Sequence, residues 1–418
     1  MSDYKLANYM IALPMNDGYI VFHTIYGYLD MITADLYDML RTEKFSEIKS
    51  DTLKFLIEHN FVIPDEMDEN QLLNQYEKAY EENRNHEKNC YIIFSYNCNL
   101  DCVYCFEKDK EGGKLTSENL DYILNAIRII NSKGKCKIVL YGGEPLLLQN
   151  YGKIKTVLEF AASEKIRIKV ITNGYCLEMF SKLLLNYLEI IDSIMITLDG
   201  EKDQHDKSRR RKDGHGTYDK IVDNIGKIDQ IGIPVEIRIN IGVDNFSNVK
   251  YFIENNEICR LHKVQIHFIE DNRNLNNGIY TIKNRNDLLI DMYNFCNYYE
   301  NISLEYPPLK QLDSMISEEN FILPLFDYCD SDNTFLFDEK GNIYNCAEAC
   351  GDERFLYKQG KHNCFLNIDI CKTCYLACIC GGGCMWKRKQ NGTQCKKEMK
   401  NLIESFIRNK LEEYEYEL

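Results

Sequence analysis

The stretch CYIIFSYNCNLDCVYCFE, residues 90–107, leads from an apolar run into three closely spaced cysteines. The run Tyr91–Tyr96 is rich in β-branched and aromatic residues and predicts a buried strand. Cys98, Cys102 and Cys105 follow it in a Cys-x3-Cys-x2-Cys arrangement. Three thiolates on one loop can hold three irons of a four-iron cluster and leave the fourth iron open to another ligand. A zinc site is the alternative, but structural zinc sites take four protein ligands and no fourth lies nearby.

Apolar runs of similar length recur downstream, separated by amphipathic stretches. They predict further strands at Lys137–Tyr141, Arg167–Thr172, Ser193–Leu198, Val235–Ile241 and Val264–Ile269. Between them, apolar residues three and four positions apart predict helices. This alternation predicts an α/β fold with a parallel sheet, closed or partly closed into a barrel. Six units are fewer than the eight of a full barrel, so we expect a partial (β/α)6 TIM-like barrel.

The cysteine spacing, with Tyr104 directly before the third cysteine, resembles the signature of the radical SAM superfamily. Gly142-Gly143-Glu144-Pro145, at the end of the second predicted strand, is similar to that family's GGEP motif. The motif engages the amino group of S-adenosylmethionine: glycines permit close backbone approach, and a carboxylate accepts hydrogen bonds from an ammonium group. The resemblance implies a partial barrel that binds S-adenosylmethionine and a catalytic [4Fe-4S] cluster on the three cysteines.

Four further polar residues resemble family positions that line the cofactor pocket. They are Asn173, Asp199, Arg209 and Asn240. Each also has a purely structural alternative. Asn173 and Asp199 could cap turns, Arg209 could form a surface ion pair, and Asn240 could simply end a strand.

A second group of cysteines lies toward the C-terminus. Its members are Cys329, Cys346, Cys371, Cys374, Cys380, Cys384 and Cys395. Their order resembles the SPASM extension of peptide-modifying radical SAM enzymes, which carries one or two auxiliary [4Fe-4S] clusters. A zinc ribbon is the alternative, because paired Cys-x2-Cys units also bind zinc. The first cysteine motif favours iron–sulfur chemistry.

The resemblance to the SPASM extension also implies a ligand set for each auxiliary cluster. Cys371, Cys374, Cys380 and Cys395 would bind the distal cluster. Cys329, Cys346 and Cys384 would bind the proximal one, which is then one ligand short. Phe335 occupies a position where some members have a cysteine. Either one iron of the proximal cluster is open to substrate, or the fourth ligand of this cluster is one of Cys350, Cys364 and Cys378.

Residues 1–65 resemble the PqqD-like recognition element of peptide maturases, a winged-helix-like module. The resemblance rests on element order: expected strands at Tyr9–Leu13 and Tyr19–Thr24, helices at Ala34–Leu40 and Asp51–Glu58 (the second capped by Ser50 or Asp51), and a closing strand at Phe61–Ile63. Such a module holds the leader of a precursor peptide by strand addition. A DNA-binding winged helix and a structural cap are the alternatives.

The whole chain divides into five expected segments. They are the recognition element (1–65), an exposed linker helix (66–89), the barrel (90–306), the SPASM module (307–400) and a C-terminal helix (401–418). The net charge of −15 disfavours nucleic acid as the main partner, although Arg209–Lys212 is locally basic. No run approaches the ~18–20 apolar residues of a membrane span. The N-terminus lacks the pattern of a secretory signal, so a cytoplasmic location is expected.

These resemblances together predict a peptide maturase. It would cleave S-adenosylmethionine reductively, with electrons from a flavodoxin- or ferredoxin-type donor, and use the 5′-deoxyadenosyl radical to install a cysteine thioether crosslink. Formylglycine formation is an alternative, but those enzymes carry an aspartate where this chain has Ala347, followed by Glu348. Carbon–carbon crosslinking and epimerisation stay open. A non-catalytic iron–sulfur or zinc scaffold, or an electron carrier, would not need Gly142–Pro145.

Overall fold

The computed structural model describes residues 3–82, 87–108, 110, 112–269, 285–317, 333–357, 365–384, 386 and 396–416. The chain forms two compact units. One comprises Met1–Arg84, Tyr306–Cys329 and His362–Leu418, and the other Asn85–Glu305 and Asp330–Lys361. None of the helices in the described part is both long and apolar enough to span a membrane.

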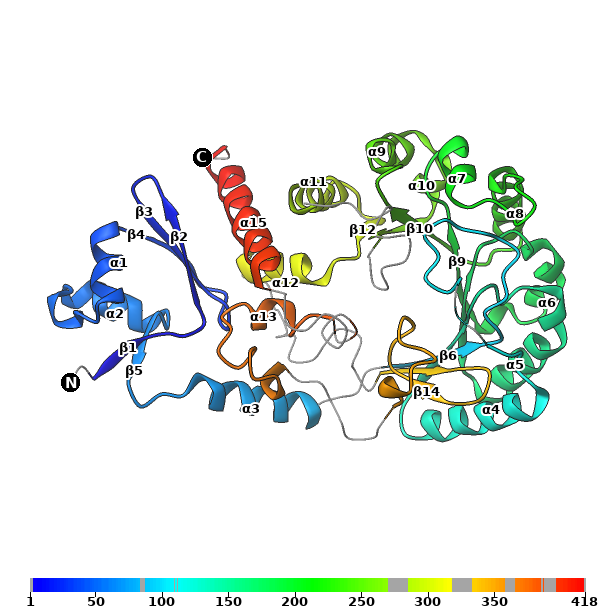
Figure 1. The fold of residues 1–418 in the computed structure, drawn as a ribbon, viewed down its shortest axis with the longest axis horizontal. Coiled ribbons are helices and arrows are strands. Elements are labelled where there is room, and N and C mark those ends of the chain that lie inside the picture. Colours follow the sequence, from blue (N-terminus) through cyan, green and yellow to red (C-terminus); the bar gives the residue numbers. More distant parts are fainter. Residues whose placement is uncertain are drawn as a thin grey trace. The chain divides into compact units, whose positions relative to one another are not determined.

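The second unit is built on a nine-stranded sheet (Figure 1). Its strands are β6 (Lys88–Ile93), β7 (Cys136–Tyr141), β8 (Arg167–Thr172), β9 (Ile191–Thr197), β10 (Val235–Ile241), β11 (Lys263–Phe268), β12 (Ile302–Leu304), β13 (Thr334–Phe337) and β14 (Ile343–Tyr344). They run in the order β12-β11-β10-β9-β8-β7-β6-β13-β14, and every pairing is parallel except that of β13 with β14. The six predicted strands therefore lie side by side, and the predicted α/β class with a parallel sheet is confirmed.

Helices alternate with the strands of this unit. They are α4 (Ser117–Ser132), α5 (Tyr151–Glu164), α6 (Ser181–Leu185), α7 (Lys202–Ser208), α8 (Tyr218–Gln230), α9 (Phe246–Asn255), α10 (Glu257–Leu261) and α11 (Asn286–Asn297). Figure 1 shows α4, α5, α6 and α8 along one face of the sheet. Thr116 caps α4 by accepting a hydrogen bond from the Asn119 amide, and the apolar side of that helix is buried. Because the strands are parallel, the loops at their carboxyl ends meet at one edge of the sheet.

The N-terminal part of the first unit contains two small antiparallel sheets. Its elements are β1 (Tyr4–Leu6), β2 (Met10–Met15), β3 (Gly18–His23), β4 (Leu29–Ile32), α1 (Ala34–Arg41), α2 (Ser50–Glu58) and β5 (Val62–Pro64). Strands β2, β3 and β4 form one sheet in that order, and β1 pairs with β5. The predicted strands and helices are all present, but the expected cap of α2 is wrong. Lys49 occupies the N-cap position and makes no side-chain capping bond.

The expectation of an exposed linker helix is also wrong for one face of α3 (Glu69–Glu82). Leu73 is fully buried, together with Tyr9, Ile25, Phe365 and Cys378, in a core that joins α3 to the N-terminal strands and to the cysteine-rich segment. The sequence of α3 is polar overall, but two adjacent leucines are enough to make a narrow apolar stripe. This core ties residues 1–65 to the C-terminal part of their own unit.

The remaining helices of the first unit are α12 (Pro307–Ile316), α13 (Ala377–Cys380) and α15 (Lys396–Tyr416). The C-terminal helix was expected at 401–418 and is α15, in which Leu402 and Phe406 are buried and Leu411 is half-buried. Short 3₁₀ turns occupy Phe45–Glu47, Leu148–Asn150, Leu177–Phe180, Leu188–Ile190, Glu353–Phe355 and Phe365–Asn367.

Candidate active site

The three cysteines of the first motif lie on the loop that follows β6, and we call residues 97–108 the cysteine loop. This loop pairs through its backbone with the segment after α7. The Asp101 amide donates to the Arg210 carbonyl over 2.8 Å, and the Val103 amide donates to the Ser208 carbonyl over 3.0 Å. Residues far apart in sequence therefore hold the loop at the carboxyl edge of the sheet.

The thiols of Cys98, Cys102 and Cys105 are close enough to influence one another. Burial raises the pKa of Cys98 to about 12, and charge on Glu144 and on the other two cysteines adds to it. Burial raises the pKa of Cys105 to about 11, with Cys102 contributing. Three clustered thiols, of which Cys102 is buried and Cys98 and Cys105 are half-buried, fit an iron–sulfur cluster with three protein ligands. Within the described ranges, no three His, Cys, Asp or Glu side chains already converge on a metal-ion position, so ligation by these cysteines stays a prediction.

Gly142 and Gly143, after β7, press against the start of the cysteine loop. A Cβ atom on Gly143 would lie 2.5 Å from the carbonyl oxygens of Tyr96 and Asn97, and one on Gly142 would lie 2.8 Å from that of Ser95. Gly142 also has a φ of 118°, which side chains disfavour. The Gly143 amide donates to the Ser95 carbonyl over 3.1 Å. Only glycine allows these two backbones to approach so closely.

Glu144 links the ends of β7 and β8. Its carboxylate is buried and accepts hydrogen bonds from the Thr172 hydroxyl (2.7 Å), the Asn173 amide (2.7 Å) and the Leu146 amide (2.8 Å). Burial raises its pKa, although these bonds oppose the change. Pro145, the last residue of the motif, accepts a bond from the Asn150 side chain through its carbonyl.

Asn173 contacts the cysteine loop directly. Its Nδ2 donates to Asn99 Oδ1 over 2.8 Å and lies 3.6 Å from Cys98 Sγ. Its Oδ1 accepts a hydrogen bond from the Tyr175 amide, so the expected turn-capping role and a contact with the cysteine motif coexist in one side chain.

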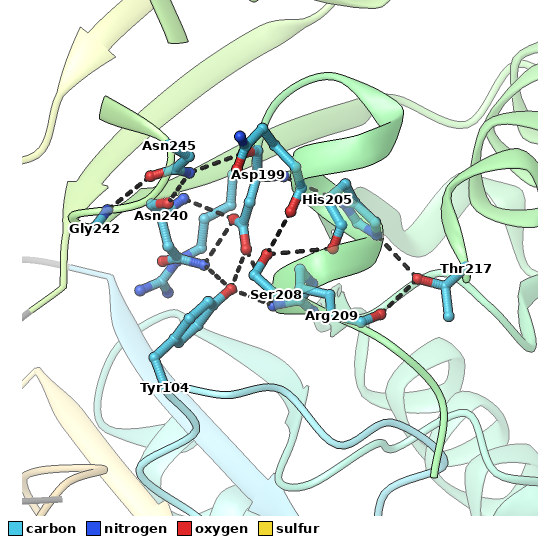
Figure 2. Close-up of polar contacts among 11 residues, drawn as sticks. Tyr104, Asp199, His205, Ser208, Arg209, Thr217, Asn240, Gly242 and Asn245 are labelled. Carbon is cyan, nitrogen blue, oxygen red and sulfur yellow. Dashed lines mark hydrogen bonds and ion pairs between the residues drawn. The ribbon is translucent and has the colours of Figure 1, made fainter. Parts of the chain in front are cut away.

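Tyr104, which is half-buried, meets the buried residues Asp199, Arg209 and Asn240 in one network (Figure 2). The Tyr104 hydroxyl donates to Asp199 Oδ2 and accepts from Arg209 Nη1 over 2.7 Å and from Asn240 Nδ2 over 3.2 Å. The Asn240 amide donates to Asp199 Oδ1 over 2.9 Å. Burial raises the pKa of Asp199, and the Arg209 guanidinium, 3.9 Å away, opposes that shift. The network joins the cysteine loop to the ends of β9 and β10. Arg209 is buried in it, so the alternative role of Arg209 in a surface ion pair is wrong.

Three residues that the sequence did not single out support this network. Burial lowers the pKa of His205 to about 3, so its ring is neutral. Its Nδ1 accepts from the Asp199 amide over 3.3 Å, and its Nε2 lies 3.0 Å from the Thr217 hydroxyl, which donates to the Arg209 carbonyl. Asn245 Nδ2 donates to the carbonyl of Asp199 over 2.8 Å and to that of Asn240. Figure 2 shows these contacts around Asp199.

A small, partly open pocket lies beside the network. Its walls include Val103, Tyr104, Asn240, Gly242, Val243 and Ile269. The lining also includes the polar residues Gln204, Lys207, Ser208, Asp244 and Asn245, and a mixture of apolar and polar groups is typical of small-molecule sites.

The second cysteine group is only partly described, since its members Cys329 and Cys395 lie outside the described residues, as does the candidate ligand Cys364. Cys346 and Cys350 belong to the second unit. The Tyr96 hydroxyl donates to Cys350 Sγ over 3.1 Å, and Lys110 Nζ donates to the Ala347 carbonyl over 2.5 Å. Both contacts hold this segment against the residues that flank the cysteine loop.

Phe335, at the position where a ligand cysteine was considered, is buried in β13 and packs edge-on against Tyr357. The remaining described cysteines of the second group lie in the first unit. They are Cys371, Cys374, Cys380 and Cys384, and the candidate fourth ligand Cys378 lies in the same unit. Cys371 and Cys378 are buried in the core shared with Tyr9 and Leu73. The structure does not test the auxiliary-cluster ligand sets.

Comparison with known proteins identifies the fold and the family of the central domain. The family model described as the radical SAM superfamily matches residues 92–254. SkfB, a sporulation killing factor maturation protein of Bacillus subtilis, is 28% identical over 168 residues, which cover 40% of this chain and 38% of SkfB. A GTP 3′,8-cyclase of Clostridium perfringens is 31% identical over 191 residues, which cover 43% of this chain and 54% of the cyclase. The matches therefore span about half or less of these relatives.

Two solved structures share the fold. The enzyme anSMEcpe, with bound AdoMet and a peptide, has a TM-score of 0.61 at 17% identity and covers 79% of this chain and 99% of its own. SuiB of Streptococcus suis, bound to its precursor peptide SuiA, has a TM-score of 0.54 at 14% identity and covers 92% of this chain and 96% of its own. Residues 92–254 are thus a domain of the radical SAM superfamily, whose cofactors are S-adenosylmethionine and a [4Fe-4S] cluster.

Proposed function

We propose that this protein is a radical SAM maturase that modifies a ribosomally made peptide. The observation that carries the proposal is the convergence of three loops at the carboxyl edge of the sheet. Gly143 packs against the start of the cysteine loop, and Asn173 donates a hydrogen bond to Asn99 within it. Tyr104 of the same loop donates a hydrogen bond to Asp199. A scaffold or an electron carrier would not require this arrangement, nor the pocket beside it.

The residues of these loops have distinct roles in the proposal. When bound together, the cluster and S-adenosylmethionine supply a 5′-deoxyadenosyl radical that removes a hydrogen atom from substrate. Cys98, Cys102 and Cys105 hold the cluster. Glu144, a buried carboxylate, accepts hydrogen bonds from the ammonium group of the methionine part. The pocket beside Tyr104 would take the nucleoside part, because apolar side chains such as Val103, Val243 and Ile269 in its lining suit a purine face.

A peptide is the substrate class that the N-terminal module supports. Strand β4 pairs only with β3 among the described strands, so its other edge can accept an added strand. Met31 on β4 is 68% exposed, and Tyr28 and Phe55 beside it are also exposed. On this side, His59 Nδ1 lies within hydrogen-bond distance of Asp30 Oδ2, at 2.8 Å. We propose that the leader of the precursor adds to β4 and places its apolar side chains on Met31 and Phe55.

The relatives support the same class. SkfB is named a maturation protein, and anSMEcpe and SuiB have been solved with peptides. The cyclase relative acts on a nucleotide, as its name says, and makes a nucleotide the second candidate. The net charge of −15 disfavours an anionic nucleotide substrate.

Within peptide chemistry we propose a thioether crosslink from a cysteine sulfur to a carbon, with auxiliary [4Fe-4S] clusters on the second cysteine group. The hydroxyl groups of Tyr9 and Thr24 donate to the carbonyls of Lys372 (2.8 Å) and Tyr375 (2.6 Å). These bonds fix the turn that carries Cys371 and Cys374. A fixed turn presents two thiolates to a metal at constant spacing, as auxiliary-cluster ligation requires.

The test is to co-express the protein anaerobically with short cysteine-containing peptides encoded beside its gene and to analyse their mass. Thioether formation removes two hydrogens and blocks alkylation of the cysteine. Formylglycine formation removes the sulfur and leaves an aldehyde that reacts with hydrazides. Carbon–carbon crosslinking also removes two hydrogens but leaves the thiol reactive, and epimerisation leaves the mass unchanged. A peptide that emerges unmodified while GTP or another nucleotide is consumed would contradict the proposal.

A further inference from the structure

Strand β10 carries three polar side chains on the face of the sheet that holds the active-site network. Side chains of a strand alternate between the two faces, so Glu236, Arg238 and Asn240 share one face, and we call them the polar row. The isoleucines that alternate with them are fully buried on the other face. The polar row therefore leads from Asn240, beside the candidate cofactor pocket, back along the strand.

The first member of the polar row is neutralised by its neighbours. The Glu236 carboxylate forms an ion pair with Lys169 of β8 over 2.8 Å. It also accepts hydrogen bonds from the Ser193 hydroxyl over 2.6 Å and from Gln265 Nε2 over 3.1 Å. These contacts connect four adjacent strands, and they explain why a half-buried carboxylate is tolerated at this position.

The second member, Arg238, has no such partner. Its Nε donates to Asn240 Oδ1 over 2.9 Å. Within the described ranges its guanidinium forms no ion pair, and its two Nη atoms make no hydrogen bond. Its neighbours in register are the uncharged residues Thr197 on β9 and Gln265 on β11. A half-buried guanidinium that lacks a carboxylate is unusual, because partial burial of a charge costs free energy unless a partner compensates it.

Arg238 also faces the space in front of the active-site network. Two residues of a strand span about 6.6 Å, so Arg238 lies that far behind Asn240 on the same face. Burial raises the pKa of Tyr141 on β7, Glu107 adds to this shift, and the charge of Arg238 opposes it. Burial likewise raises the pKa of Asp199, and Arg238 is among the groups that oppose the change. The guanidinium is therefore within electrostatic reach of side chains from both β7 and β9.

We propose that Arg238 binds a carboxylate of the substrate peptide close to the residue that is modified. This inference rests on the proposed function, which makes the substrate a peptide, and carboxylates are the anions of an unmodified peptide. A guanidinium binds a carboxylate through two parallel hydrogen bonds, and both Nη atoms of Arg238 are available for them. Because Arg238 and the pocket-lining Asn240 are joined by a hydrogen bond, a peptide held at Arg238 lies next to the proposed nucleoside site.

Three groups could supply this carboxylate: an Asp or Glu side chain, the C-terminus of the peptide, and the methionine part of S-adenosylmethionine. The last is disfavoured by position. The proposed site of the methionine part is at Glu144, between the ends of β7 and β8, whereas Arg238 lies within β10. The test therefore compares all three sources.

The test measures kcat/KM for peptide modification by the anaerobically reconstituted full chain. The probes are the cysteine-containing peptides encoded beside the gene. They are made with each Asp and Glu changed singly to Asn or Gln, and with the C-terminus free or amidated. The variants are Arg238→Gln, which removes the charge, and Arg238→Lys, which keeps it. The control is Arg260→Gln, at an exposed arginine of α10 whose guanidinium donates to the Glu254 carbonyl. Affinity for S-adenosylmethionine is measured by calorimetry.

We expect the wild type and the control to prefer one carboxylate probe over its matched amide by about tenfold or more in kcat/KM. Arg238→Gln should bring this ratio close to one by slowing only the carboxylate probe, and Arg238→Lys should keep part of the preference. A purely structural role of Arg238 would instead slow both probes equally.

Three results would overturn the inference: a wild type that is indifferent to every carboxylate, an unchanged ratio in Arg238→Gln, and an equal loss on both probes. If the ratio is unchanged while S-adenosylmethionine binds more weakly to Arg238→Gln, the guanidinium serves the methionine carboxylate and the inference fails. A wild type that modifies none of the probes would instead refute the proposed function.

Discussion

The contact of Gly143 with the cysteine loop is the tightest constraint in the candidate active site. An alanine there would place its Cβ 2.5 Å from two backbone oxygens, which cannot move without displacing the loop. Glu144, directly after it, accepts three hydrogen bonds from the end of β8 and from its own turn. A motif of four residues thus combines close backbone contact with a buried acceptor.

Gly143→Ala should destabilise the protein by about 1–3 kcal/mol, as overpacking does, and should lower the iron retained after anaerobic reconstitution. Gly152→Ala is the control, because nothing lies within 4 Å of a Cβ at Gly152 in helix α5. Iron per chain and thermal unfolding are measured for both variants. Equal iron contents in the two variants would show that the glycine contact does not hold the cysteine loop.

Tyr104→Phe removes the hydroxyl that joins Asp199, Arg209 and Asn240. Loss of a buried partner costs about 1–3 kcal/mol, and the pocket wall formed by Asn240 should loosen. We expect weaker binding of S-adenosylmethionine with iron content near that of the wild type, measured by calorimetry on the reconstituted protein. Tyr298→Phe, at an exposed tyrosine, is the control and should change neither quantity. If Tyr104→Phe binds S-adenosylmethionine as tightly as the wild type does, the network does not contribute to cofactor binding.

The sequence alone identified the site residues that belong to a motif. It did not identify the residues that act through tertiary contacts. Tyr104 and Asp199 were singled out by resemblance, and the structure brings them together. His205 and Thr217 were not, because a buried histidine bonded to a backbone amide has no local pattern. Among strands, Val235–Ile241 was predicted to the residue, since its apolar run is long. Ile302–Leu304, with three residues, is too short to show a period.

The edge of β4 is the element that the proposed leader binding depends on. Met31→Glu/Phe55→Glu should weaken binding of a fluorescent leader peptide, because two charges would replace the apolar contacts on the edge. Both side chains are exposed, so folding stability should stay within about 0.5 kcal/mol of wild type. Met179→Glu, at an exposed methionine of the second unit, is the control. Fluorescence anisotropy measures affinity, and unchanged leader binding in the double variant would exclude this edge.

The first unit is held together by contacts between the ends of the chain. Tyr9 and Ile25 from the N-terminal strands share a core with Phe365 and Cys378, and Leu73 of α3 completes it. Arg408 in α15 donates to the Pro14 carbonyl over 2.7 Å. Deletion of the N-terminal residues 1–65 therefore also removes part of this core, which the rest of the first unit needs in order to pack.

Deletion of residues 1–65 should expose the surface of the cysteine-rich segment that Tyr9 and Ile25 cover. We expect the truncated protein to bind a hydrophobic dye and to elute as aggregates in size-exclusion chromatography, whereas Met31→Glu/Phe55→Glu remains monodisperse. A truncated protein that stays monodisperse and retains slow cleavage of S-adenosylmethionine would instead show that residues 1–65 serve recognition alone.

The central claim is that the cysteine loop holds a cluster that cleaves S-adenosylmethionine. The most direct measurement is 5′-deoxyadenosine, quantified by mass spectrometry, from the anaerobically reconstituted full chain with dithionite. Wild type and Cys259→Ala, a buried thiol in α10, should form the product, and Cys98→Ala, Cys102→Ala and Cys105→Ala should form none while remaining folded. Product formation by any of these three variants at the wild-type rate, or its absence from the iron-loaded wild type, would contradict the account.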